Sequence, residues 1–210
     1  MNILITGCAG FIGFSLSEFF LKKGYKITGI DNLDNYYSTR LKNERLKILK
    51  KYKNFHFKKV DISIKQNLYF LKKIKYTYVF HFAAQAGVRY SLVNPQKYFD
   101  TNITGYFNLI LSINKKNLKK IIYASSSSVY GEQKKYPTPE NTMLNAKNPY
   151  ANSKVINERI SEILSEAYDI KFIGLRFFTV YGEWGRPDMF IMKLLNCIYK
   201  NKTFHLNNNG

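Results

Sequence analysis

Cysteine is scarce in this chain of 210 residues, which contains only Cys8 and Cys197. Two cysteines so far apart match no metal-binding or redox motif and build no disulfide framework. The sequence therefore excludes a disulfide-rich secreted scaffold and predicts no metal site. A reducing, cytoplasmic location is the default expectation.

Long hydrophobic runs are also absent, because no stretch reaches the ~18 apolar residues of a membrane-spanning helix. Residues 1–20 are apolar enough to imitate a signal peptide, but they lack a positively charged start and carry regularly spaced glycines. We therefore expect no membrane span and no membrane partner.

Acidic residues are few: 14 Asp and Glu stand against 33 Lys and Arg, and the formal net charge is +19. Such a charge is typical of nucleic-acid-binding proteins, which stay one alternative. The lysines, however, are spread along the chain in small groups without interleaved aromatic residues. These groups are Lys22, Lys23 and Lys26, then Lys47, Lys50 and Lys51, then Lys115, Lys116, Lys119 and Lys120. We expect a solvated basic surface that favours an anionic ligand, and no nucleic-acid partner.

Hydrophobic residues make up 45% of the chain, enough to bury a sizeable core. Their spacing predicts strands that alternate with helices. The expected strands are 2–6, 26–30, 54–60, 77–82, 119–124 and 171–176, and the expected helices are 11–23, 39–51, 64–73, 95–114, 149–168 and 187–200. Alternation of this kind produces a parallel sheet covered on both faces. The predicted fold class is α/β, a doubly wound parallel sheet of the Rossmann type.

Informative residues follow the expected strands. They are Gly7, Asp31, Asp61, 82–85, 125–128 and 177–179. Ligands of open parallel sheets bind at the carboxyl ends of the strands. The coincidence favours a functional site at this edge over a set of unrelated turns.

Three glycines, Gly7, Gly10 and Gly13, lie between the first strand and the first helix. Gly7 permits a tight turn, Gly10 allows a pyrophosphate to approach the backbone, and Gly13 lets helix and strand pack closely. Asp31 ends the next strand, where a carboxylate accepts hydrogen bonds from ribose hydroxyls and repels a 2′-phosphate. The pattern favours NAD over NADP. A structural turn with a solvated aspartate is the alternative.

Tyr150 and Lys154 are four residues apart, so they share one face of a helix. A nearby ammonium and a cationic nicotinamide ring favour the phenolate and lower the pKa of the tyrosine. Tyr150 could then accept a proton from a sugar hydroxyl. Alone, the pair is equally explained as a surface pair. The serines 125–128 directly after the fifth expected strand could bind a substrate hydroxyl or carboxylate, or form a plain polar turn.

Taken together, these motifs resemble the extended short-chain dehydrogenase/reductases, and within them the NAD-dependent nucleotide-sugar epimerases and dehydratases. The likeness covers residues 2 to about 205 and is greatest to the UDP-glucuronate 4-epimerases. It is carried by the T-G-x-x-G-x-x-G spacing and by the segments 31–33, 81–91, 125–131, 175–182 and 185–189.

The resemblance implies roles for individual residues. The implied catalytic residues are Tyr150, Lys154, which also holds the nicotinamide ribose, and Ser126, which shares the reacting hydroxyl. The implied cofactor-binding residues are Gly7, Gly10, Phe11, Ile12, Gly13, Asp31, Asn32, Asp61, Ile62, Phe82, Ala83, Ala84, Gln85, Asn102, Tyr150, Lys154 and Phe177. The implied substrate-binding residues are Arg89, Ser126, Ser127, Ser128, Thr179 and Arg186.

Two details select among the relatives. Dehydratases carry an acid just after the serine or threonine, where this chain has Ser127 and Ser128. UDP-galactose 4-epimerases carry an asparagine where this chain has Thr179. The expected reaction is conversion of UDP-glucuronate to UDP-galacturonate through a 4-keto sugar. A UDP-glucose 4-epimerase, a dehydratase and an inactive NAD-binding interaction module stay as alternatives.

The resemblance also predicts the domain organisation. Residues 1–180 correspond to the NAD-binding domain, and residues 181–210 to the start of a substrate-binding region that is largely missing. We therefore expect the 210 residues alone to bind NAD but to turn over poorly. A homodimer through the helices near Pro95 and Tyr150 is expected from the same resemblance.

Overall fold

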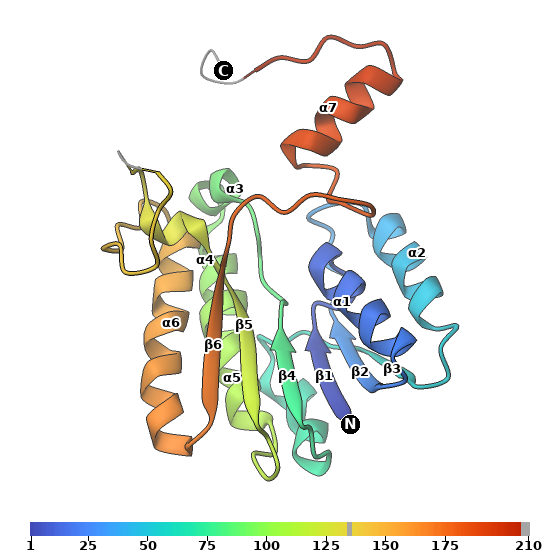
Figure 1. The fold of residues 1–210 in the computed structure, drawn as a ribbon, viewed down its shortest axis with the longest axis vertical. Coiled ribbons are helices and arrows are strands. Elements are labelled where there is room, and N and C mark those ends of the chain that lie inside the picture. Colours follow the sequence, from blue (N-terminus) through green and yellow to red (C-terminus); the bar gives the residue numbers. More distant parts are fainter. Residues whose placement is uncertain (134–135, 207–210) are drawn as a thin grey trace.

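The computed structural model describes residues 1–133 and 136–206, and they form a single six-stranded sheet with helices on both faces (Figure 1). The strand order is β3-β2-β1-β4-β5-β6, and every neighbouring pair is parallel. The strands are β1 (Asn2–Thr6), β2 (Lys26–Asp31), β3 (Phe55–Lys59), β4 (Tyr78–His81), β5 (Lys120–Ser126) and β6 (Lys171–Phe177). The predicted doubly wound Rossmann architecture is confirmed.

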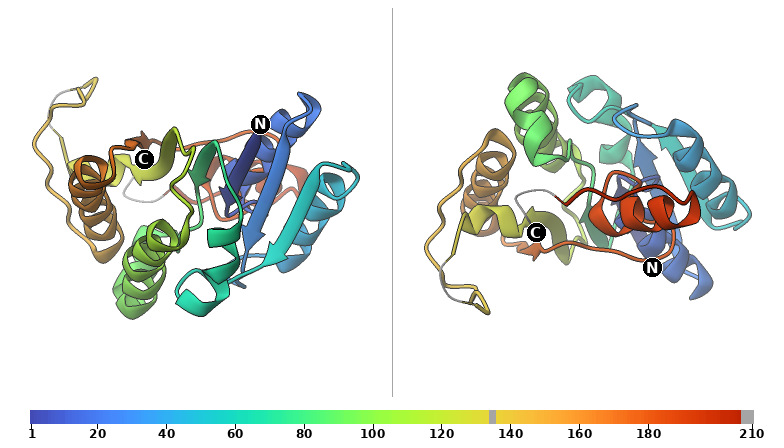
Figure 2. Two further views of the ribbon diagram at one scale, coloured as in Figure 1. Left: turned by 90° about the horizontal axis from the view of Figure 1, so that it is seen from below. Right: turned by 90° about the horizontal axis from the view of Figure 1, so that it is seen from above.

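Helices cover the sheet on both sides, and Figure 2 shows the sheet between them. The longer ones are α1 (Phe11–Lys22), α2 (Thr39–Leu49), α5 (Gly105–Ser112), α6 (Pro149–Tyr168) and α7 (Phe190–Tyr199). The shorter ones are the 3-10 segments η1 (Lys65–Lys73) and η3 (Ser127–Tyr130), the helices α3 (Val88–Val93) and α4 (Pro95–Tyr98), and the π-helical segment η2 (Phe99–Thr104).

Strand β1 lies between two core clusters, one on each face of the sheet. Ile3 and Ile5 pack into the core cluster beneath α1 and α2, whereas Leu4 packs into the cluster beneath α5. Successive side chains of a strand point to opposite faces. A central strand of a doubly covered sheet therefore needs apolar residues at every position.

The predicted helix 95–114 is confirmed as a helical segment over Pro95–Ser112, but it is not α-helical throughout. Asn94 accepts a hydrogen bond from the Lys97 amide at the start of α4, and the chain then widens into the π-helical segment η2 before α5. The predicted helix 64–73 has 3-10 geometry, and the last helix begins at Phe190 because a turn at Arg186 precedes it.

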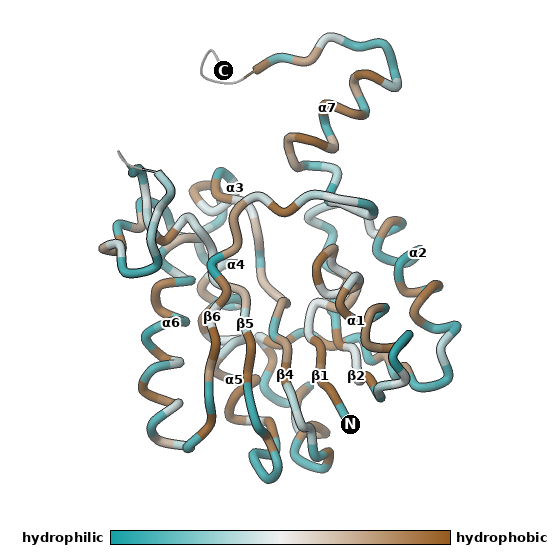
Figure 3. Tube along the Cα trace, in the orientation of Figure 1, coloured by the Kyte–Doolittle hydropathy of each residue, from teal (hydrophilic) through white to brown (hydrophobic). Residues whose placement is uncertain are grey.

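Helix α7 projects from the body of the molecule (Figure 1), and none of its residues is buried. Figure 3 shows brown, hydrophobic segments along it. Among the helices that the structure describes, none combines the length and apolarity that a bilayer crossing requires.

Candidate functional site

A cavity of about 440 Å³ opens at the carboxyl edge of the sheet. Its wall is contributed by the ends of β1, β2, β4, β5 and β6, as expected for an open parallel sheet. Most of the residues implied by the resemblance lie on this wall. They are Gly7, Gly10, Phe11, Ile12, Gly13, Asp31, Asn32, Ile62, Phe82, Ala83, Ala84, Gln85, Ser126, Ser127, Ser128, Tyr150, Lys154, Phe177, Thr179 and Arg186.

The glycine loop has the geometry that its spacing predicts. Gly7 adopts φ +69°, and a Cβ there would lie 2.7 Å from the Ala83 amide nitrogen. A Cβ on Gly13 would collide with the Gly7 carbonyl oxygen, so α1 can pack against the loop only with glycine. No side chain caps the start of α1 at Gly10, and its first amides are available to a phosphate.

Asp31 is held by the backbone at the end of β2. Its carboxylate accepts hydrogen bonds from the amides of Ala9 at 3.0 Å and Leu33 at 2.8 Å. Burial raises the pKa of Asp31, while these amides and the nearby cations of Lys42 and Arg45 act in the opposite direction. The carboxylate therefore has a fixed orientation on the cavity wall.

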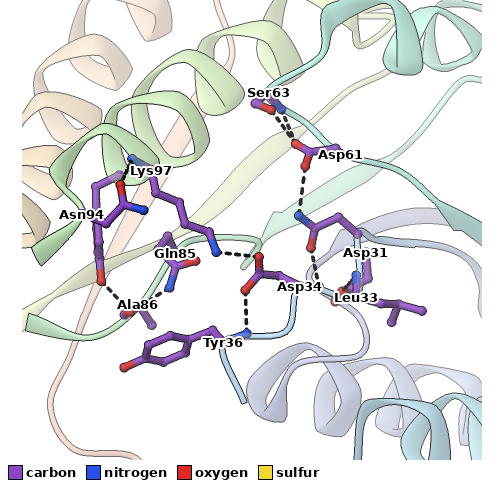
Figure 4. A network of polar contacts seen from close by, with 12 residues as sticks. Asp31, Leu33, Asp34, Tyr36, Asp61, Ser63, Gln85, Ala86, Asn94 and Lys97 are labelled. Carbon is purple, nitrogen blue, oxygen red and sulfur yellow. Dashed lines mark hydrogen bonds and ion pairs between the residues drawn. The ribbon is translucent and has the colours of Figure 1, made fainter. Parts of the chain in front are cut away.

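Asp61, in contrast, lies outside the main cavity. One of its oxygens accepts from the Asn32 side-chain amide at 3.1 Å, and the other accepts from the Ser63 amide and hydroxyl (Figure 4). Burial raises the pKa of Asp61, but these bonds outweigh it and lower the pKa overall. Asp61 thus orients Asn32, which does lie on the wall.

Asn102 is fully buried in η2 and is also absent from the cavity wall. Its oxygen accepts from the Gln85 amide at 2.8 Å, and its amide group donates to the Gln85 carbonyl and to the Ser153 hydroxyl. Ser153 in turn donates to the Tyr150 carbonyl. The side chain predicted to contact the cofactor instead ties the loop after β4 to the start of α6.

Tyr150 and Lys154 lie in the first turns of α6. Asn148 caps this helix by accepting from the Ala151 amide at 2.9 Å, and Pro149 follows at its start. The Lys154 ammonium donates to the Ala124 carbonyl at 2.8 Å and lies 5.9 Å from the centre of the Tyr150 ring. The predicted pair therefore comes together against the end of β5.

The expected lowering of the Tyr150 pKa does not arise from the protein alone. Burial raises the pKa of this phenol, and its hydrogen bond with Ser126 and the charge of Arg186 offset only part of the effect. Burial also lowers the pKa of the Lys154 ammonium to about 8. The ammonium is directed at a carbonyl group, so the protein desolvates the phenol more than it stabilises a phenolate.

The serine segment divides into two parts. Ser126 accepts from the Ser128 amide at 3.1 Å, lies on the cavity wall, and acts to lower the pKa of the Tyr150 phenol. Ser125 donates instead to the buried carboxylate of Glu158. Ser127 and Ser128 lie on the cavity wall in η3.

Glu158 belongs to a buried network that sequence reasoning missed. It forms a two-pronged ion pair with Arg176 of β6, at 3.0 Å from Nε and 2.8 Å from Nη2. Arg176 also donates to the Tyr130 hydroxyl and the Glu140 carbonyl. The network fastens α6, β5 and β6 together one helical turn beyond Lys154. The available signal was a carboxylate four residues after Lys154, on the same helix face.

Arg186 lies on the cavity wall, but its guanidinium group already donates hydrogen bonds within the protein. Nε and Nη2 donate to the two carboxylate oxygens of Asp188 at 3.1 and 2.5 Å. Burial alone would lower the pKa of Arg186, and the Asp188 carboxylate raises it. Arg89, the other predicted arginine, is exposed and lies away from the wall.

Cationic residues of α2 were also missed. Lys42 lies on the cavity wall and donates to the Asp34 carbonyl at 2.7 Å. Arg45 is fully buried and donates to the carbonyls of Ala9 and Trp184, so it links the glycine loop to the segment after β6. Their spacing of three residues on one helix face was the available signal.

Comparison with known proteins agrees with this site. The model of the NAD dependent epimerase/dehydratase family matches residues 3–210. An uncharacterized protein of Methanocaldococcus jannaschii is 45% identical over 100% of this chain and 65% of its own length. A UDP-glucuronate 4-epimerase of Thermodesulfobacterium geofontis is 42% identical over 99% of this chain and 64% of its own length.

Among solved structures, the UDP-glucuronic acid 4-epimerase of Bacillus cereus, in complex with UDP-glucuronic acid and NAD, superposes with a TM-score of 0.88 at 33% identity. The match covers 96% of this chain and 64% of that one. This chain thus spans less than two thirds of the length of these relatives. It belongs to the NAD-dependent epimerase/dehydratase family, whose cofactor is NAD.

Proposed function

We propose that this chain is the nucleotide-binding part of an NAD-dependent epimerase that inverts C4 of a nucleotide sugar, with UDP-glucuronate and UDP-galacturonate as its substrate pair. One observation carries the proposal: Tyr150, Lys154 and Ser126 meet on the wall of the cavity that the glycine loop also lines. The names of similar proteins, including the two 4-epimerases above, support the same reaction.

The residues of the cavity fit NAD. The glycine loop packs so closely that a Cβ on Gly7 or Gly13 would collide with backbone atoms, and the uncapped start of α1 follows this loop. Asp31 presents a fixed acceptor for ribose hydroxyls. Among the described residues, the Lys154 ammonium donates to one acceptor, the Ala124 carbonyl, whereas an ammonium has three protons to donate. A ribose hydroxyl would satisfy it. When bound, NAD takes a hydride from C4 of the sugar and later returns it.

Tyr150 performs the proton chemistry in this proposal. Its phenolate oxygen accepts the proton of the C4 hydroxyl, and the sugar carbon becomes a ketone. After the ketone has turned over, Tyr150 returns the proton to the C4 oxygen on the opposite face. Because burial raises the pKa of this phenol, Tyr150 becomes a base only when positive charge gathers beside it. Lys154 and Ser126 stabilise the phenolate at that moment.

The proposal that the substrate is a uronate rests on three side-chain hydroxyls and one guanidinium group on the cavity wall. Ser127, Ser128 and Thr179 line the cavity, and Arg186 lies there with a fork that matches a carboxylate. Asp188 occupies this fork in the structure, so a substrate carboxylate would replace or share that partner. The position after Ser126 is a serine, and elimination chemistry lacks an acid there.

The extent of the chain limits what it does alone. We assign residues 1–180 to NAD binding and residues 181–210 to the start of the substrate-binding region. Since the chain spans 65% and 64% of the length of two relatives, we propose that these 210 residues alone bind NAD and turn over poorly. We also propose a homodimer, which the exposed Val93, Phe99 and Phe107 near α4 and α5 support. Sedimentation analysis tests it, and a monomer at high concentration contradicts it.

The test begins by purifying the protein and identifying any dinucleotide that it retains. The protein is then incubated with UDP-glucuronate or UDP-glucose, and two signals are followed: the absorbance of reduced nicotinamide and the C4 proton of the sugar by NMR. Reduced nicotinamide with UDP-glucuronate supports the proposal. Bound NAD that no UDP-sugar reduces would favour the inactive interaction module, and rapid epimerisation would refute the predicted weakness of this chain.

A further inference from the structure

Lysines dominate the connections that lead from a helix into the next strand. These segments are residues 23–26, 50–54, 74–77, 113–120 and 169–171, and three of them include the first residue of the next strand: Lys26 of β2, Lys120 of β5 and Lys171 of β6. Together they hold eleven lysines and a single acidic residue, Asp169. The lysines are Lys23, Lys26, Lys50, Lys51, Lys53, Lys75, Lys115, Lys116, Lys119, Lys120 and Lys171.

The fold gathers these separate groups at one edge. In a parallel sheet every helix-to-strand connection ends where the strands begin, opposite the cavity. The register places Lys120 beside Lys171, and Lys75 bridges to Asn114. The Lys119 amide donates to the Thr77 carbonyl at 2.9 Å. We call this edge, the lower rim in Figure 1, the lysine rim; its turns are largely teal in Figure 3.

The charge of the lysine rim is not compensated within the protein. Nine of the eleven lysines are exposed, and none forms an ion pair in residues 1–133 and 136–206. Burial, and to a smaller extent the charge of Lys72 in the neighbouring η1, lower the pKa of Lys115. An extended, unpaired cationic rim has a strong attraction for an anionic surface.

We propose that the lysine rim attaches the protein peripherally to an anionic phospholipid surface, with the cavity directed away from the bilayer. Phospholipid headgroups form a continuous layer of phosphate charge that many lysines can contact at once. Each lysine near such a surface contributes a modest, salt-sensitive attraction, and the contributions accumulate. Because the site lies at the opposite edge, substrate and cofactor still reach it.

The composition of the rim favours lipid over nucleic acid. No arginine occurs in these five connections, although arginine is the residue that grips single phosphates and base edges through two bonds. Their aromatic residues are Tyr25, Tyr52 and Tyr76, and none of the three is exposed. A stacking platform for bases is thus absent from this part of the described structure.

The test measures co-sedimentation of the purified protein with vesicles of phosphatidylglycerol and phosphatidylcholine, against vesicles of phosphatidylcholine alone. We expect binding to the anionic vesicles only, with affinity that falls as salt increases. The variant Lys75→Gln, Lys116→Gln, Lys119→Gln, Lys171→Gln changes exposed residues of the rim. It should bind at least about tenfold more weakly.

A matched control changes four exposed lysines elsewhere: Lys65→Gln, Lys147→Gln, Lys193→Gln, Lys200→Gln. It has the same net charge as the rim variant and should lose less than about twofold. Retained NAD binding shows that both variants fold. Equal losses in the two variants would mean that bulk charge alone acts, and would overturn the proposal. Failure to bind anionic vesicles, or displacement from them by equimolar RNA, would overturn it too.

Discussion

The two edges of the sheet differ in how they use charge. The connections from strand to helix, at the carboxyl edge, hold six acidic and four basic residues. Several charged groups at this edge have defined partners. Asp31, the last residue of β2, accepts hydrogen bonds from two backbone amides, and Asp61 accepts from Ser63 and Asn32. Arg186 donates to Asp188. The amino edge holds eleven lysines, nine of them exposed, and none of the eleven forms an ion pair within the part of the chain that the structure describes.

The difference has a structural origin. Strands at the carboxyl edge point toward the free amides of helix starts, where a negatively charged ligand is stabilised. Several charged side chains there, such as Asp31, Asp61 and Arg186, are buried or half-buried, and each of these must be matched to a partner or to a ligand. At the amino edge the chain only turns and re-enters the sheet. Exposed side chains there are solvated by water, so they need no specific partner in the protein. Chemistry is therefore concentrated at one edge and unpaired charge at the other.

Removing one oxygen at the carboxyl edge should give the largest effect. In Tyr150→Phe, reduction of bound NAD by UDP-glucuronate should slow by about 10²–10⁴-fold, because no group accepts the C4 proton. NAD content should not change, since the ring stays in place. Stopped-flow absorbance measures the rate. Tyr181→Phe, which alters an exposed tyrosine, is the control; if the Tyr150 variant were as fast as this control, the catalytic role would be wrong.

Opening the Glu158–Arg176 pair should be the next largest effect. Arg176→Met leaves the mostly buried Glu158 carboxylate without its cation, and the free energy of unfolding should fall by about 3 kcal/mol. Urea unfolding measures it. Arg159→Met breaks the exposed pair with Glu162 on the same helix and should cost less than about 0.5 kcal/mol. Similar losses for both variants would contradict the structural role of the buried network.

The buried ammonium of Lys154 should lower stability in a pH-dependent way. Its pKa of about 8 lies below the ordinary lysine value, so the unfolded chain binds the extra proton more tightly. The loss of stability caused by burying the charged ammonium is complete below pH 8. It disappears as the pH rises through the ordinary lysine pKa of 10.5. Lys154→Met should therefore raise the free energy of unfolding at neutral pH by about 1–3 kcal/mol, and NAD affinity should fall.

Thermal unfolding across this pH range, in the absence of NAD, measures the difference between wild type and Lys154→Met. The advantage of the variant should shrink as the pH rises above 8. Lys193→Met, at an exposed position of α7, should show no such trend. A constant difference at all pH values would sink the idea that desolvation of the ammonium is the cause.

Neutralising the lysine rim should have the smallest effect on stability, and the opposite sign from opening the Glu158–Arg176 pair. The fourfold Lys→Gln rim variant removes like-charge repulsion. At low salt its free energy of unfolding should therefore stay the same or rise by up to ~0.5 kcal/mol. The gain should vanish at high salt, where repulsion is screened. Thermal scans at two salt concentrations test this. A clear loss of stability would show that the rim is part of the packed fold.

Several features could be read from the sequence because their causes are local. Helix α6 begins and ends where the pattern predicts, since Asn148 and Pro149 specify its start. The glycine loop and Asp31 were located because one strand and one turn decide their geometry. The segment expected as a helix at 95–114 is helical from Pro95 to Ser112. Its π-helical turn was not predicted, because this turn directs Asn102 inward to contacts with Gln85 and Ser153.

The sequence by itself therefore determined the order of strands and helices along the chain, the parallel sheet and the place of the Tyr150–Lys154 pair. Hydrophobic spacing, helix caps and glycine conformations act over a few residues and are visible in the chain. Only the tertiary structure decided which buried charges meet, as Glu158 and Arg176 do, and that scattered lysines share one rim. Those outcomes depend on distances between segments remote in sequence, and burial and electrostatic energies depend on such distances rather than on residue order.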